Sequence, residues 1–341
     1  MKMVNALESG QEEFSFINGE SPARDGRKDV LRAFLPSNFV YFPLPLKSTD
    51  KSVSKYEREY NNFKMVMKGD KGIPGGKIGR ELLAFFTTEA VKNGSSGGDI
   101  ELNFDSLTQL NSVLGIKRGS SFETTTDMIE KFAYTSVSFF RKRNDVYRKG
   151  EIQGYLTNGE RADLAKRAEE KNVIQLKEMY NMFFFKKYGE LSIEKDKARS
   201  GEAISVNIVL SEAFVKMVSE HPIKINWNIY KEIKSSLEKD MYVWFVYRNN
   251  GRFPAEGIHI PRNKIIGQFG FGQKDTGKGL EEKRVYQYIM EAIRNIKKKY
   301  LNEMDFEEVK DCRGYGNGIL LKKSNYEEDN NALMYAPLFN W

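Results

Sequence analysis

Hydrophobic positions in the last quarter of the chain first recur at helical spacing and then alternate. In residues 280–301 apolar side chains return every three or four positions, as on the buried face of a helix. The expected buried stripe consists of Val285, Ile289, Ala292, Ile293, Ile296 and Tyr300. Residues 306–323 alternate around a glycine-rich centre and predict a β-hairpin. Upstream, IHIPRNKIIGQFGFG predicts a short strand followed by a short helix.

The polar side of the 280–301 helix is basic. At about 100° per residue, one group of side chains falls opposite the apolar stripe. These outward positions are Lys283, Arg284, Gln287, Arg294 and Lys298. Lys and Arg bind phosphates, and Arg and Gln can also read base edges. Strand, helix, basic helix and hairpin is the order of a winged-helix DNA-binding module, and a solvated face on an ordinary core helix is the alternative.

The hairpin would form the wing of this module. Its glycines at 314, 316 and 318 permit a tight turn. The wing residues expected to contact DNA are Arg313, Tyr315, Asn317, Lys322 and Lys323. An exposed loop without DNA contacts is the alternative.

A similar order of elements occurs in the first half of the chain. Residues 77–93 predict a helix, residues 99–104 a strand, and residues 104–116 a helix capped by Asp105 and closed by Gly115. FETTTDMIEKFAYT predicts another helix, and SVSFFRKRNDVY and VIQLKEMYNMFFFKKYGELS predict two long strands. We therefore expect an α+β fold with two tandem winged-helix domains, each a helix-turn-helix plus a β-hairpin wing.

The first of these units has a different surface chemistry. The outward face of its second helix carries Glu123, Asp127, Glu130 and Lys131, so it is mostly acidic and would be repelled by phosphates. The positively charged candidates for DNA contact lie at the entrance of that helix and at a strand end: Lys117, Arg118, Arg141, Lys142 and Arg143. For Arg141, Lys142 and Arg143 the alternative is that these charges only keep the end of the strand soluble. The first unit is expected either to grip the DNA backbone or to mediate self-association.

These patterns divide the chain into five parts. A flexible N-terminal arm is expected over residues 1–38, and the first winged-helix domain over 39–194, with a charged insertion near 150–172. Residues 195–202 read as a linker, and residues 203–323 as the second winged-helix domain. Residues 324–341 are an acidic spacer and an apolar C-terminal peptide, which either folds back or docks a host protein.

Composition narrows the classes of function. The chain has 341 residues, a net charge of +7 and a pI of about 9.1, which is consistent with a polyanionic partner. A single cysteine excludes a disulfide framework and a cysteine-based zinc finger. The sequence has neither a signal-peptide core nor an apolar run long enough for a bilayer, so a cytoplasmic protein without membrane association is expected.

Two enzymatic alternatives fit the sequence poorly. GQKDTGKG resembles a phosphate-binding loop, but Gly279 stands where a Ser or Thr would bind magnesium. The only histidines, His221 and His259, are far apart, whereas nicking enzymes need a paired-histidine metal site. We therefore expect no catalytic activity, no cofactor and no metal.

Several segments in order resemble the plasmid-encoded RepA family of replication initiators. The resemblance covers roughly residues 39–300 and rests on YFPLPLKS, IPGGKIGRELLAFFTTEAVKN, IELNFDSLTQLNSVLGI, RGSSFETTTDMIEKFAYTSVSFF, VNIVLSEAFVKMVSEHPIKINWNIYKEIKSSLEKDMYVWFVYR and IHIPRNKIIGQFG. It implies tandem winged-helix domains that bind repeats in double-stranded DNA at a plasmid origin, open the duplex and recruit host replication proteins such as an initiator, helicase or clamp. A homodimer is compatible with this function. A transcriptional repressor, including an autorepressor, is the nearer alternative.

Overall fold

Helices and antiparallel strands alternate along the chain, so the fold is α+β, as expected. The computed structural model describes residues 32–60, 63–94, 97–104, 106–114, 116, 121–143, 175–187, 206–249, 257–270, 282–302, 304–310 and 317–322. Parts of the expected arm, the charged insertion, the linker and the C-terminal peptide lie outside these ranges. Within the described part of the chain, no helix is both long enough and apolar enough to cross a membrane.

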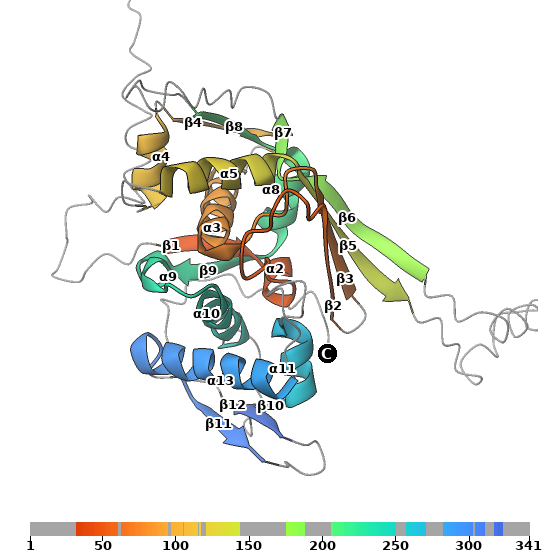
Figure 1. Ribbon diagram of the computed structural model, residues 1–341, viewed down its shortest axis with the longest axis vertical. Helices are drawn as coiled ribbons and strands as arrows, with labels where there is room; N and C mark the ends of the chain where they lie inside the picture. Colours follow the sequence, from red (N-terminus) through yellow and green to blue (C-terminus); the bar gives the residue numbers. More distant parts are fainter. Residues whose placement is uncertain are drawn as a thin grey trace, which may run out of the picture.

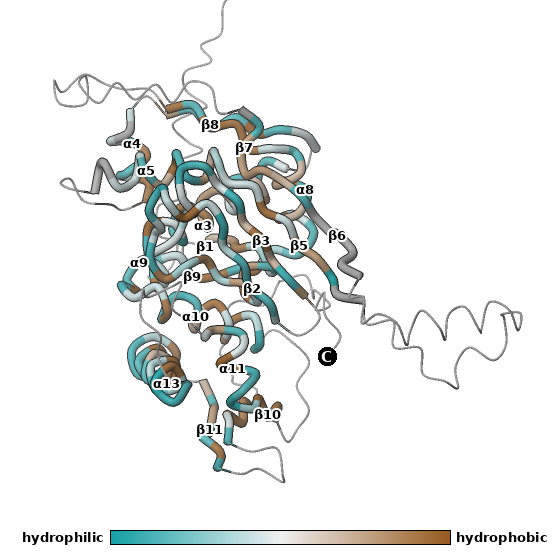
Figure 2. The backbone as a smooth tube through the Cα atoms, turned by 45° about the vertical axis from the view of Figure 1, so that its right-hand side comes forward, coloured by the Kyte–Doolittle hydropathy of each residue, from teal (hydrophilic) through white to brown (hydrophobic). Residues whose placement is uncertain are grey.

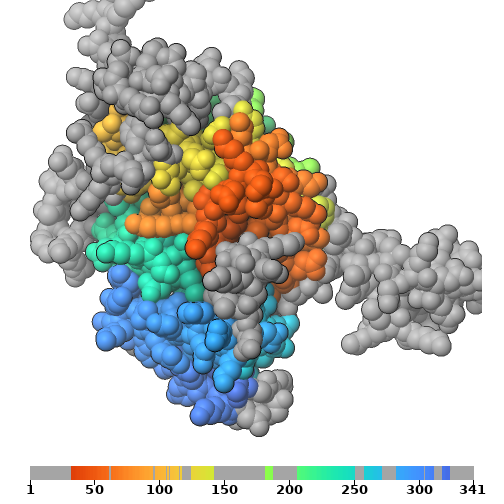
Figure 3. All heavy atoms as spheres, viewed as in Figure 1, coloured from red at the N-terminus to blue at the C-terminus, as the bar shows by residue number. Residues whose placement is uncertain are grey.

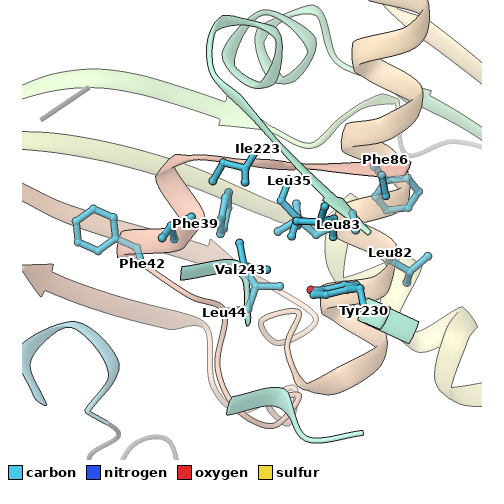
Figure 4. Packing of buried hydrophobic residues seen from close by; sticks show 14 of the residues in the cluster. Leu35, Phe39, Phe42, Leu44, Leu82, Leu83, Phe86, Ile223, Tyr230 and Val243 are labelled. Atoms are coloured by element: carbon cyan, nitrogen blue, oxygen red, sulfur yellow. The ribbon is translucent and has the colours of Figure 1, made fainter. Parts of the chain in front are cut away.

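Helix α3 (Gly76–Asn93) lies in the middle of the fold (Figure 1). The antiparallel pair β1 (Arg32–Pro36) and β9 (Pro222–Asn226) runs beside it, and α5 (Ser121–Ala133) and α10 (Ser236–Asn249) also pack on it. Apolar side chains from all these elements form one buried cluster. Figure 4 shows part of it, including Leu35, Leu83, Phe86, Ile223 and Val243. Both halves of the chain therefore contribute to one core.

A four-stranded antiparallel sheet projects from this core in the order β2-β3-β5-β6 (Figures 1 and 2). Its strands are β2 (Lys55–Tyr60), β3 (Phe63–Gly69), β5 (Thr135–Arg143) and β6 (Gln175–Phe183). In β5 the side chains of Val137 and Phe139 are buried, while Ser136 and Ser138 are more exposed. This alternation is what a sheet with one covered face requires.

The strand expected over residues 99–104 has an unexpected partner. Strand β4 (Ile100–Phe104) pairs with β8 (Val206–Leu210), and β8 pairs on its other side with β7 (Phe185–Lys187). A strand from beyond the expected linker thus separates β4 from the strands expected to form the first wing. The helix after β4, α4 (Leu107–Leu114), is also shorter than expected: the hydroxyl of Ser106 accepts a hydrogen bond from the backbone N–H of Gln109 at 3.1 Å, which is the usual capping contact.

In the second half, three described helices precede the elements expected for the last quarter of the chain. Helix α8 (Glu212–Glu220) is capped by Ser211, because the Ser211 hydroxyl accepts from the N–H of Phe214. Helices α9 (Trp227–Glu232) and α10 follow it. Then come β10 (Ile258–Pro261), α11 (Arg262–Phe269), α13 (Glu282–Lys299) and the antiparallel hairpin β11 (Phe306–Val309) and β12 (Gly318–Leu321), and the sheet order is β10-β12-β11.

Two of the expected boundaries, the end of the arm at residue 38 and the linker at 195–202, do not separate independently packed parts of the structure. Residues 32–38, placed in the flexible arm, contain β1 and the start of the short helix α2 (Asn38–Tyr41), so the arm prediction is wrong for them. Strand pairs β1–β9 and β4–β8 join segments on either side of residues 195–202. Apolar burial explains the difference for β1, because Ala33 and Leu35 are almost fully buried against the core.

A buried group of four charged residues also joins the two halves. Arg80 on α3 and Asp240 on α10 form a bidentate ion pair, with Nε–Oδ1 and Nη2–Oδ2 distances both of 2.7 Å. One residue further along α3, Glu81 accepts from the Lys239 ammonium of α10 at 3.1 Å. Arg80, Glu81 and Lys239 are all nearly inaccessible to solvent. Opposite charges on both helices therefore fix how α3 and α10 lie against each other.

Strand β2 holds the second half at another point. The guanidinium of Arg58 donates to the carbonyls of Gln268 and Gly270 at 2.9 and 2.6 Å, so it caps the C-terminal end of α11. The Gln268 amide in turn donates to the carbonyl of Val40 at 3.0 Å. These contacts place α11 and the helix that follows it relative to the projecting sheet.

Candidate nucleic-acid interface

Helix α13 and the β11–β12 hairpin form one end of the molecule, at the bottom of Figures 1 and 3. The predicted apolar stripe of α13 is confirmed for Val285, Ile289 and the other members up to Ile296, which are all buried. Tyr300 is only partly buried, and Met290, which the sequence analysis omitted, is buried. The stripe packs against α10 and α11, so the opposite side of the helix remains outward.

Every polar residue predicted to face outward from α13 is exposed. These residues are Lys283, Arg284, Gln287, Arg294 and Lys298. Their contact with DNA stays a prediction. The same face exposes two residues that are not in the predicted outward set: Glu291, and Tyr288, whose side chain is 50% exposed. Helical spacing alone would have found Glu291, because it lies four residues after Gln287 and three before Arg294.

Two of the candidate cations have acidic partners on the hairpin. Arg294 donates from Nε and Nη2 to the Glu308 carboxylate at 2.7 and 2.6 Å. Lys322 pairs with Glu307 at 2.6 Å, and this hydrogen bond raises the pKa of the Lys322 ammonium. These pairs tie α13 to β11 and β12 to β11. They also reduce the positive charge that the hairpin side of the surface offers to a phosphate.

Cation–aromatic contacts set the position of α13 on its neighbours. The Arg262 guanidinium of α11 lies 5.0 Å from the centre of the Tyr286 ring, and the Lys297 ammonium lies 4.8 Å from the Phe306 ring of β11. Asn295 donates to the Glu238 carboxylate of α10 at 2.9 Å. The first turns of α13 and its C-terminal third are thus held by separate contacts.

The structure describes both strands of the hairpin, and residues 311–316 between them lie outside the described ranges. Asn317 is exposed, and its carbonyl accepts from the backbone N–H of Arg262 at 2.8 Å. Gly318 lies within β12 rather than in the turn, and a Cβ there would come within 2.3 Å of the Ile260 carbonyl, so close pairing with β10 requires glycine. Arg313, Tyr315 and Lys323 lie outside the described residues.

In the first expected unit, Arg141 is the one candidate for DNA contact whose side chain is among the described residues. Arg141 is exposed at the end of β5, with its guanidinium 5.8 Å from the centre of the Phe63 ring. Lys142 and Arg143 belong to the same strand, but their side chains are outside the description, as are Lys117 and Arg118 entirely.

One expectation for the second helix of this unit is wrong. The sequence predicts Lys131 on the outward face of α5, but this side chain is only 5% exposed. Its ammonium donates to the Ser48 hydroxyl at 2.7 Å and pairs with Asp127 at 2.7 Å. The loop containing Ser48 covers this side of α5, so a side chain at a helical position typical of solvent is buried by a segment far away in the sequence.

Comparisons with known proteins give a limited result. The chain matches no protein-family model and no curated protein sequence. A crystal structure of selenomethionine derivatives of domains 2 and 3 of RctB is similar at a TM-score of 0.47 and 14% identity, over 86% of this chain and 99% of that chain. A second crystal structure of RctB domains 2-3 gives a TM-score of 0.40 at 13% identity, over 85% and 95%. These values are too low to carry a conclusion about function.

Proposed function

We propose that this protein is a sequence-specific DNA-binding protein that initiates plasmid replication. In this proposal α10 to β12 form a winged-helix unit, α13 enters the major groove, and the β11–β12 hairpin acts as the wing. The protein binds repeats at an origin, promotes opening of the duplex and recruits host replication proteins. It does so without catalysing a reaction and without a cofactor.

One observation carries the proposal. Helix α13 is buried along one side, exposes Lys283, Arg284 and Lys298 on the other, and is followed by an antiparallel hairpin in a sheet of order β10-β12-β11. A helix of about ten to twelve ångströms in diameter fits the major groove, and cations at its surface bind phosphates. The ordered resemblance of residues 39–300 to the plasmid RepA family supports the same reading and adds the role in replication.

The experiment is a replication assay with a plasmid that carries this gene and its flanking DNA as the only replication functions. We expect the wild type to maintain the plasmid and Arg284→Ala to lose it. The matched control is Lys216→Ala, which removes an exposed cation from α8, at the other end of the fold (Figure 1). If the wild type does not support replication but represses a reporter driven by the flanking DNA, the repressor alternative replaces the proposal.

A further inference from the structure

A carboxylate occupies the middle of the basic face of α13. Gln287, Glu291, Arg294 and Lys298 follow each other at spacings of four, three and four residues, so they form one exposed stripe along the helix. Among the described residues Glu291 has no ion pair, because Arg294, its neighbour one turn on, is turned to Glu308 of β11. The centre of the stripe is therefore acidic.

Positive charge lies toward the two ends of the same helix. Lys283 and Arg284 are near the start, and Lys298 and Lys299 are near the end, all of them exposed. At about 1.5 Å per residue, Glu291 is roughly 12 Å along the axis from Lys283 and roughly 10 Å from Lys298. A helix lying across the major groove brings its ends toward the two phosphate backbones and its centre toward the base edges. The charges of α13 match this division.

We propose that Glu291 accepts a hydrogen bond from the N4 amino group of a cytosine and thereby selects a C·G pair in the binding site; this inference rests on the proposed DNA-binding function. An ionised carboxylate can only accept hydrogen bonds. In the major groove cytosine presents its amino donor without a neighbouring acceptor, whereas adenine places its N7 acceptor beside the N6 donor. Cytosine is thus the base that this carboxylate recognises best.

The same carboxylate disfavours other sequences. Where no amino group faces it, Glu291 loses water without gaining a hydrogen bond and is repelled by the phosphate charge. Glu291 therefore lowers the affinity of α13 for unrelated DNA, while Lys283 and Lys298 raise the affinity for any duplex. The balance between them gives the helix its preference for one sequence.

The test is selection of binding sites from a library of random duplexes with the full-length protein. Wild type, Glu291→Gln and Glu282→Gln are compared. Glu282→Gln makes the same change of charge on the same helix, at an exposed position of the first turn and outside the central stripe. Affinities for one mixed-sequence duplex are measured in parallel, and thermal melting shows that the variants are folded.

For Glu291→Gln we expect the preference for one C·G pair to fall about tenfold or more, since one well-placed contact discriminates by that order. Its other selected positions stay unchanged, and its affinity for the mixed-sequence duplex rises severalfold. Glu282→Gln keeps the wild-type site. If wild type and Glu291→Gln select the same site, the role of Glu291 is refuted and the DNA-binding proposal stands. If the wild type selects no site at all, sequence-specific binding itself is refuted, and the inference fails with it.

Discussion

Replacing Asp240 by Leu should destabilise the whole fold, because it leaves the Arg80 guanidinium buried without its counter-charge. Arg80 is 3% exposed and uses all its N–H groups, on Asp240 and on the carbonyls of Leu44, Pro45 and Gly76. Breaking a buried ion pair from one side costs about 3–5 kcal/mol. We therefore expect Asp240→Leu to lower the free energy of unfolding by that amount.

The double variant Arg80→Met/Asp240→Leu should be more stable than the sum of the single variants implies. It contains no unpaired buried charge, and its main remaining defect is the Leu44 carbonyl, which accepts from Arg80 at 2.6 Å. The Pro45 carbonyl keeps the N–H of Gly76 at 2.9 Å. One unsatisfied buried carbonyl costs about 1–3 kcal/mol, so we expect a coupling energy of at least ~2 kcal/mol between the two sites.

Urea unfolding monitored by tryptophan fluorescence and by circular dichroism measures both quantities. Trp227 and Trp244 are buried in the second half, whereas circular dichroism reports on all helices. The buried ion pairs between α3 and α10 join the two halves of the chain. We therefore expect both probes to show one transition in the wild type. Additive single-variant losses would refute the coupling. Separate transitions of the two probes would show that the halves unfold independently, against the reasoning from the shared core.

Three further outcomes are expected. Arg284→Ala and Lys298→Ala should each weaken binding to a duplex and reduce the salt dependence by about one ion, without changing the melting temperature; wild-type affinity in both would exclude α13 as the groove helix. Burial lowers the pKa of the Lys239 ammonium from 10.5 to about 8. The unfolded chain therefore binds more protons than the folded protein between these values, so stability should rise between about pH 8 and 10, by at most ~3 kcal/mol, and Lys239→Met should flatten this rise in urea midpoints. Ser211→Ala should cost about 1 kcal/mol in thermal melts through loss of the α8 cap, whereas exposed Ser219→Ala should cost less.

Local patterns were sufficient for the elements of the proposed DNA-binding end. The apolar stripe of α13 and the β11–β12 hairpin depend on residues a few positions apart, and the side-chain spacing itself specifies them. The outward positions of Lys283, Arg284 and Lys298 follow from the same periodicity. Whether these positions contact DNA is a separate question that the proposed experiments address.

Contacts between distant segments were decided only by the tertiary structure. The pairing of β1 with β9 and of β4 with β8 joins strands more than a hundred residues apart, and no local pattern names such a partner. Lys131 is buried because the loop with Ser48 covers it, and Arg294 is neutralised because β11 brings Glu308 beside it. A sequence specifies which face of each element is apolar, but the charge that a surface presents depends on which residues the fold brings next to it.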